Sequence, residues 1–75
     1  MIVISTAGCK SCEKVKEYLD SKDIEYDEVD LSEKSNREAR RHYRDSGYRL
    51  LPVIECNGWV VEGCNIELLE EYING

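Results

Sequence analysis

The chain has 75 residues and a formal net charge of −6, with 41% hydrophobic and 35% charged residues. This length suits one folding unit, and the apolar content is that of a globular protein rather than of a disordered segment. The acidic balance argues against nucleic acid or an anionic membrane as a partner, and no apolar stretch approaches the ~18 residues of a membrane span.

The first part of the sequence predicts a strand, a helix and a second strand. Residues 1–5 form a short apolar run typical of a buried strand, and residues 11–21 carry apolar side chains at helical spacing. Residues 24–31 alternate apolar and acidic side chains, which is the pattern of a half-buried strand. The short link Lys22-Asp23 suits a crossover between two parallel strands.

The next segment predicts a second helix. Ser35 and Glu38 have the spacing of a capping box, and a start near Ser32 fits equally well. Gly47 suits the position just after the helix end. The helix is polar, with Ala39 and Tyr43 as its clear apolar anchors, so we expect it to lie at the surface.

The last part of the chain predicts a hairpin and a third helix. Asn57-Gly58 separates the strand-like runs 52–56 and 59–62, which favours a two-residue hairpin with a type I′ turn. Asn65 can cap the helix that follows. The order β-α-β-α-β-β-α predicts an α/β protein with a four-stranded mixed sheet covered by helices on both faces.

The motif Cys9-Lys10-Ser11-Cys12 lies where the first predicted strand gives way to the first helix. In that position one thiol meets the positive end of the helix, where free backbone N–H groups favour its thiolate. The second thiol lies about one turn away and can close a disulfide with the first. These two thiols are the minimum that thiol–disulfide exchange requires. We interpret the pair as redox-active rather than as a structural disulfide.

The two remaining cysteines, Cys56 and Cys64, are expected to lie apart. A two-residue turn puts Cys56 opposite Trp59 and leaves Cys64 at the far end of the hairpin, roughly 13 Å away. A disulfide needs Cα atoms within ~7 Å, so a bridge is disfavoured, and a zinc site using all four cysteines fails likewise. We expect Cys56 to be a small buried hydrophobe, Cys64 a semi-exposed spare thiol or an auxiliary redox residue, and no metal.

Three short segments resemble the glutaredoxins, in an order that covers nearly the whole chain. They are the Cys9–Cys12 motif, residues 47–52 (Gly-Tyr-Arg-Leu-Leu-Pro) and residues 62–65 (Glu-Gly-Cys-Asn). Members of the family typically carry Cys-Pro-Tyr-Cys, Thr-Val-Pro and Gly-Gly-Cys-Asp. The resemblance implies the thioredoxin fold over residues 1–75 and a dithiol thiol–disulfide oxidoreductase.

The resemblance also implies roles for single residues. Cys9 would be the attacking thiolate, Cys12 the resolving thiol, and Pro52 a cis-proline beside the active site, where the alternative is a trans proline opening an edge strand. Leu51 would offer its backbone groups to an extended substrate. The implied substrate- and glutathione-binding residues are Lys10, Arg49, Leu51, Pro52, Gly63, Cys64 and Asn65.

Two departures from the family pattern leave the electron source open. Thr6 stands where glutathione-dependent members usually have Lys, and Asn65 and Ile66 replace the usual acid. Residues 48–53 also look like the small glutaredoxin-like electron donors of ribonucleotide reductase, which are reduced by thioredoxin reductase. Glutathione is the expected reductant, and thioredoxin reductase is the alternative.

Two other classes of function compete with a reductase. Some glutaredoxins bridge an iron–sulfur cluster through the first cysteine and glutathione, and a non-catalytic interaction domain is the third class. We interpret His42 as a surface side chain and Trp59 as a packing residue. We expect a cytoplasmic monomer that acts on disulfide-containing proteins, since the N-terminus shows no secretory signal.

Overall fold

The computed structural model describes residues 1–74, and its elements follow the predicted order β-α-β-α-β-β-α. The strand order across the sheet is β2-β1-β3-β4. β1 is parallel to β2 and antiparallel to β3, which is antiparallel to β4, so the predicted four-stranded mixed sheet is confirmed. The bounds are β1 Ile2–Ser5, α1 Lys10–Ser21, β2 Asp27–Asp30, α2 Arg37–Asp45, β3 Val53–Cys56, β4 Trp59–Glu62 and α3 Ile66–Asn74.

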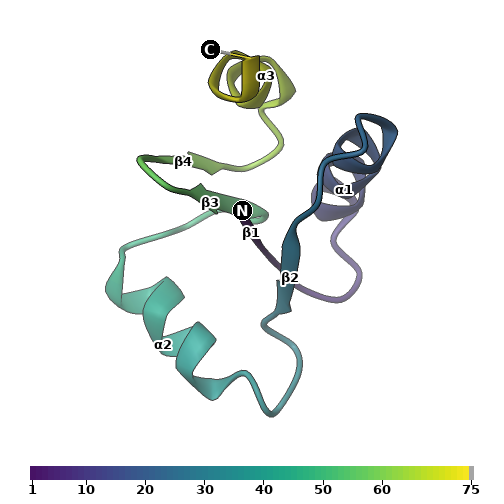
Figure 1. Cartoon of the computed structure of the whole chain (residues 1–75). Coiled ribbons are helices and arrows are strands. Elements are labelled where there is room, and N and C mark those ends of the chain that lie inside the picture. Colours follow the sequence, from purple (N-terminus) through teal and green to yellow (C-terminus); the bar gives the residue numbers. More distant parts are fainter. Residues whose placement is uncertain (75) are drawn as a thin grey trace.

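Helices cover both faces of the sheet, with α1 and α3 on one side and α2 on the other (Figure 1). Val3, Ile54 and Val61 are paired across β1, β3 and β4, so their side chains share one face. They form the core with side chains from α1 and α3. The fully buried cluster consists of Val3, Val15, Leu19, Ile54, Val61 and Leu69.

The first helix ends in a turn that shortens the second strand. The Ile24 N–H donates to the Leu19 carbonyl at 3.0 Å, and Asp23 has a φ of 56°. Because residues 24–26 complete this turn and lead into the sheet, β2 begins only at Asp27 rather than at residue 24. Lys16 of α1 then pairs with Glu28 of β2 at 2.6 Å, and this bond raises the pKa of the lysine.

The second helix begins later than the capping-box pattern predicts. Asn36 is the N-cap residue, and its side chain makes no capping hydrogen bond. Instead, the Asn36 side-chain amide donates to the Asp30 backbone carbonyl at 2.9 Å, and the Ser32 hydroxyl donates to the Asp30 carboxylate. Both predicted starts, Ser35 and Ser32, are therefore wrong. Gly47, with a φ of 79°, follows the Ser46 cap as predicted.

The hairpin has the predicted register, with Cys56 opposite Trp59. Of the two turn residues, Gly58 has a φ of 96°. Asn57 has a negative φ, because Asp23 is the one non-glycine residue of the described chain with a positive φ. The signs of φ are thus those of a type II turn, and the predicted type I′ turn is wrong. Trp59 stacks on Tyr72 of α3 at 5.0 Å between ring centroids, which confirms its packing role. Nowhere in residues 1–74 does a helix have the length and hydropathy to cross a membrane.

Candidate functional site

Cys9 and Cys12 form a disulfide at the start of α1, with their Cα atoms 5.3 Å apart. Cys9 is the N-cap of the helix, and its sulfur accepts the Cys12 backbone N–H at 3.2 Å. Cys9 is half-buried, whereas Cys12 is only 1% exposed. An outside sulfur can therefore reach Cys9 but not Cys12.

The Leu51–Pro52 peptide bond is cis, as expected. It lies at the edge of the sheet where β1 ends and β3 begins, which is the edge that carries the cysteine pair. β1 and β3 are antiparallel with Ile4 opposite Val53, so the chain enters β3 where the loop to Cys9 leaves β1. The carbonyl of Pro52 accepts the Gly63 N–H at 2.7 Å. This bond brings the segment 63–65 to the same edge.

Position 63 requires a glycine, both because of its backbone conformation and because of a neighbouring side chain. Its φ is 79°, and a Cβ atom built there would lie 3.3 Å from Leu50 Cδ1. A side chain at this position would press on Leu50 and strain the backbone. The glycine therefore keeps the end of β4 close to the loop that precedes Pro52.

The loop before Pro52 is held in place by Tyr43, Glu55 and Glu62, through contacts that the sequence did not predict. The Tyr43 hydroxyl donates to the Leu50 carbonyl at 3.1 Å, and Glu62 accepts the Arg49 N–H at 3.0 Å. The Tyr48 hydroxyl donates to Glu55 Oε2 at 2.6 Å. With its backbone fixed on both sides, Leu50 presents a side chain that is 57% exposed.

His42 is exposed, but it is not a free surface side chain. Its Nε2 lies 2.7 Å from Glu55 Oε2, so the carboxylate joins α2 to β3 and to Tyr48. Burial alone would raise the pKa of Glu55, but the hydrogen bonds from Tyr48 and His42 outweigh it and hold this pKa below its ordinary value. Burial and the bond to Glu55 also raise the pKa of Tyr48, with the hydrogen bond as the larger cause.

The other predicted binding residues are exposed, but they lie on different elements and Asn65 has a structural role. Lys10 is exposed at the first turn of α1, Arg49 is exposed in the loop before the cis-proline, and Cys64 is an exposed free thiol. Asn65 caps α3, since its side-chain oxygen accepts the Leu68 N–H at 3.2 Å. Its amide oxygen is thus already engaged. Cys56 is also a free thiol and is half-buried rather than fully buried.

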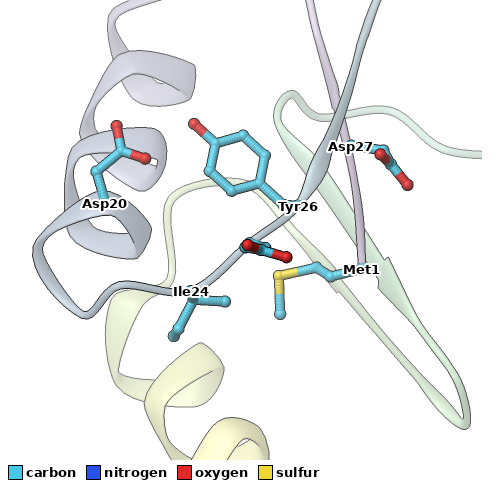
Figure 2. A pocket seen from close by; sticks show the side chains of 6 residues that line it. Met1, Asp20, Ile24, Tyr26 and Asp27 are labelled. Atoms are coloured by element: carbon cyan, nitrogen blue, oxygen red, sulfur yellow. The ribbon is translucent and has the colours of Figure 1, made fainter.

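A hollow of ≈ 710 Å³ lies at the opposite edge of the sheet, between the end of α1 and the start of β2 (Figure 2). In this view the Tyr26 ring points toward Asp20 of α1, and the side chains of Ile24 and Met1 lie together below the ring. Burial, followed by the charge of Asp20, raises the pKa of Tyr26. No thiol lines this hollow, so the redox chemistry belongs to the other edge. Across residues 1–74, no three His, Cys, Asp or Glu side chains gather in a group that could hold a metal ion.

Comparison with known proteins assigns this arrangement to a family. The glutaredoxin family model matches residues 1–61. An uncharacterized glutaredoxin-like 8.6 kDa protein in the rubredoxin operon of Clostridium pasteurianum is 34% identical over 73 residues, which are 95% of this chain and 93% of that protein. Glutaredoxin 1 of Rickettsia conorii is 32% identical over 66 residues, and the match spans 87% of this chain but only 65% of that protein.

Solved structures agree on the fold. The thioredoxin-like protein BC3987 is 28% identical, with a TM-score of 0.79 over 93% of this chain and 94% of that one. A buckwheat glutaredoxin, solved as its glutathione complex, is 25% identical with a TM-score of 0.72, covering 99% of this chain and 68% of that one. The glutaredoxin-like NrdH-redoxin of Escherichia coli has a TM-score of 0.84 over 93% of this chain and 90% of that one, and its 17% identity supports the fold alone.

Proposed function

The chain belongs to the glutaredoxin family and is a thiol–disulfide oxidoreductase, and we propose that it reduces protein disulfides and mixed disulfides of glutathione. The observation that carries this proposal is the unequal burial of its two thiols. Cys9 is half-buried at a helix N-terminus, while Cys12 is 1% exposed behind it. Such a pair can accept one outside sulfur and then expel it.

The reaction proceeds in two exchanges, in each of which one sulfur–sulfur bond forms and another breaks. The Cys9 thiolate attacks one sulfur of the substrate disulfide, and the second substrate sulfur leaves as a thiolate that takes a proton. Cys12, having lost its proton, then attacks the Cys9 sulfur and releases the first substrate sulfur as a thiol. The product is the Cys9–Cys12 disulfide seen in the structure, two electrons poorer than the dithiol.

The segment around Pro52 supplies the surface on which the substrate lies. The loop from Tyr48 to Leu51 is fixed by Tyr43, Glu55 and Glu62, so Leu51 has a defined position before the cis-proline. Its backbone N–H and carbonyl would pair with an extended substrate strand, as in strand addition. Lys10 and Arg49, both exposed near this edge, would contact the carboxylates of a glutathionyl group.

Glutathione is our first candidate for the external reductant, and the glutathione bound by the buckwheat relative supports it. Two glutathione thiols would restore the dithiol and leave as oxidised glutathione. The engagement of Asn65 in capping α3 favours the second candidate, thioredoxin reductase, because the side-chain oxygen at the position of the usual acid is already a hydrogen-bond acceptor for the helix. In that case the chain would act as an electron donor to an enzyme such as ribonucleotide reductase. The free thiols Cys56 and Cys64 support a reducing, cytoplasmic location.

A coupled assay tests the activity and the reductant together. NADPH oxidation is followed during reduction of a small neutral disulfide, with glutathione and glutathione reductase in one reaction and thioredoxin reductase alone in the other. Turnover in the first supports glutathione, and turnover in the second alone supports the reductase-fed donor. Cys9→Ser should abolish turnover, and Cys12→Ser should accumulate mixed disulfides visible by mass spectrometry. Full activity of the Cys9→Ser variant would overturn the assignment.

A further inference from the structure

The outer surface of α2 carries four arginines, Arg37, Arg40, Arg41 and Arg44, which we call the arginine face. Their spacing of three, one and three residues keeps them within an arc of about 100° on the helix. All four are exposed, and together they line a hollow of ≈ 400 Å³. The half-buried residues of the helix, Ala39 and Tyr43, lie on the opposite side.

This surface differs in charge from the rest of the molecule. Residues 30–50 contain six Lys and Arg and four Asp and Glu, for a net charge of +2. The remaining residues contain four Lys and Arg and twelve Asp and Glu, for a net charge of −8. On so acidic a chain, an ordinary solvated helix face would carry both positive and negative side chains. A row of positive side chains alone therefore indicates an anionic partner.

The guanidinium groups of this face are only partly used within the molecule. Arg40 donates to the carbonyls of Leu31 and Glu33 at 3.0 and 2.6 Å. Arg44 makes a long, exposed contact of 3.4 Å with Asp45. In the part of the chain that the structure describes, Arg37 and Arg41 make no ion pair. At least two guanidinium groups are therefore open to a carboxylate.

The position of Arg40 connects this face to the redox pair. The Leu31 N–H bonds the Ser5 carbonyl at 2.8 Å, and β1 and β2 are parallel, so the loop that Arg40 holds leaves the same edge of the sheet as the loop to Cys9. If one segment of a partner binds the arginine face, the segments of that partner next to it would thus lie near the cysteines.

We propose that the arginine face docks a short acidic segment of disulfide-bearing protein substrates, an inference that rests on the proposed reductase function. Arg37 and Arg44 are about 10 Å apart along the helix, which matches about three residues of an extended chain. Carboxylates are the chemistry that bidentate guanidinium groups select. A long polyanion, such as a nucleic acid strand or an anionic bilayer, would extend beyond this short face and meet the −8 of the remaining surface.

The test compares two disulfide peptides that differ only in charge. One carries four glutamates beside its disulfide and the other carries four glutamines at the same positions. The enzyme is the wild type, the double variant Arg37→Glu/Arg41→Glu, or a control. The control, Lys14→Glu/Lys22→Glu, has the same change in net charge at two exposed residues, one on α1 and one at its C-cap. Thermal unfolding checks that each variant is folded, and a small neutral disulfide reports the reductase activity of the wild type by itself.

The wild type should reduce the glutamate peptide with a KM about five- to tenfold below that of the glutamine peptide, since a few exposed ion pairs contribute this much. The preference should weaken in 0.5 M salt, vanish in the arginine double variant and persist in the lysine control. Equal KM values in the wild type, or equal loss in both double variants, would overturn the docking proposal. Stronger competition by a single-stranded oligonucleotide or anionic vesicles than by a glutamate peptide without cysteines would overturn the assigned partner. Failure with the neutral disulfide would instead overturn the reductase function.

Discussion

The two sulfur atoms of the redox pair have different surroundings. Cys9 is half-buried and accepts a backbone N–H, while Cys12 is 1% exposed. We therefore expect iodoacetamide to alkylate Cys9 of the reduced protein about tenfold faster than Cys12. Mass spectrometry of a Cys56→Ser/Cys64→Ser variant, which removes the two free thiols, measures both rates. Equal rates at the two positions, or faster modification of Cys12, would contradict the assigned roles.

The carboxylate of Glu55 should make stability depend on pH. Its pKa in the folded protein is lowered, so its contribution is present above the ordinary value of 4.5 and is lost as the pH falls through the folded value. At pH 7 we expect the wild type to exceed Glu55→Gln by about 1 kcal/mol in the free energy of unfolding. The difference should shrink below pH 4.5. Urea titrations at several pH values, with the exposed Glu67→Gln as control, measure it, and a difference constant with pH would refute it.

At the residue scale, the sequence predicted the groups that are close in the chain and missed those that are not. Cys9 and Cys12 are three residues apart, so a local motif specifies their geometry. His42 and Glu55 are separated by 13 residues, as are Arg49 and Glu62. Their contacts depend on how α2 lies on the sheet and on which residues of β3 and β4 face it. No local pattern in the sequence carries that information.

At the scale of elements, the loop before Pro52 depends on support from α2. Tyr43→Phe removes the hydroxyl that donates to the Leu50 carbonyl at 3.1 Å. We expect kcat/KM for a peptide disulfide to fall about threefold, because the lost hydrogen bond, worth about 1 kcal/mol, also loosens the substrate surface. Tyr26→Phe, at the opposite edge of the sheet, should leave kcat/KM unchanged. Equal effects of the two variants would show that the tyrosine at position 43 acts on overall stability alone.

The boundaries of the elements show where sequence patterns are weak. The hairpin register and the α3 cap were predicted because Asn57-Gly58 and Asn65 act through their immediate neighbours. The start of α2 was not, because Asn36 and Ser32 bond the end of β2 through Asp30 instead of capping the helix. β2 was predicted too long because Ile24 bonds back to α1. In each case a contact with another element overrides a local preference.

Over the whole molecule, the buried cluster lies on the side of the sheet that α1 and α3 cover, and the buried pair Ile4 and Val53 faces the other side. Both α1 and α3 contribute buried residues, whereas α2 has none and is attached by the side chains of His42, Tyr43 and Arg40. Local opening of α2 should therefore require less free energy than global unfolding. Native-state hydrogen exchange should show amides 41–45 of α2 exchanging well before those of β1 and β3.

A substitution in the core separates local from global opening. Leu69 is completely buried, so Leu69→Ala should cost about 3 kcal/mol of the ~5–10 kcal/mol that holds such a chain folded. Amides of β1, β3 and α1, which exchange by global unfolding, should then exchange about 100-fold faster. Those of α2 should keep their rates, because their opening leaves Leu69 in place. Val60→Ala, at a side chain 43% exposed, is the control that should change neither group. Parallel acceleration of α2 and β1 would mean that α2 unfolds only with the rest of the molecule.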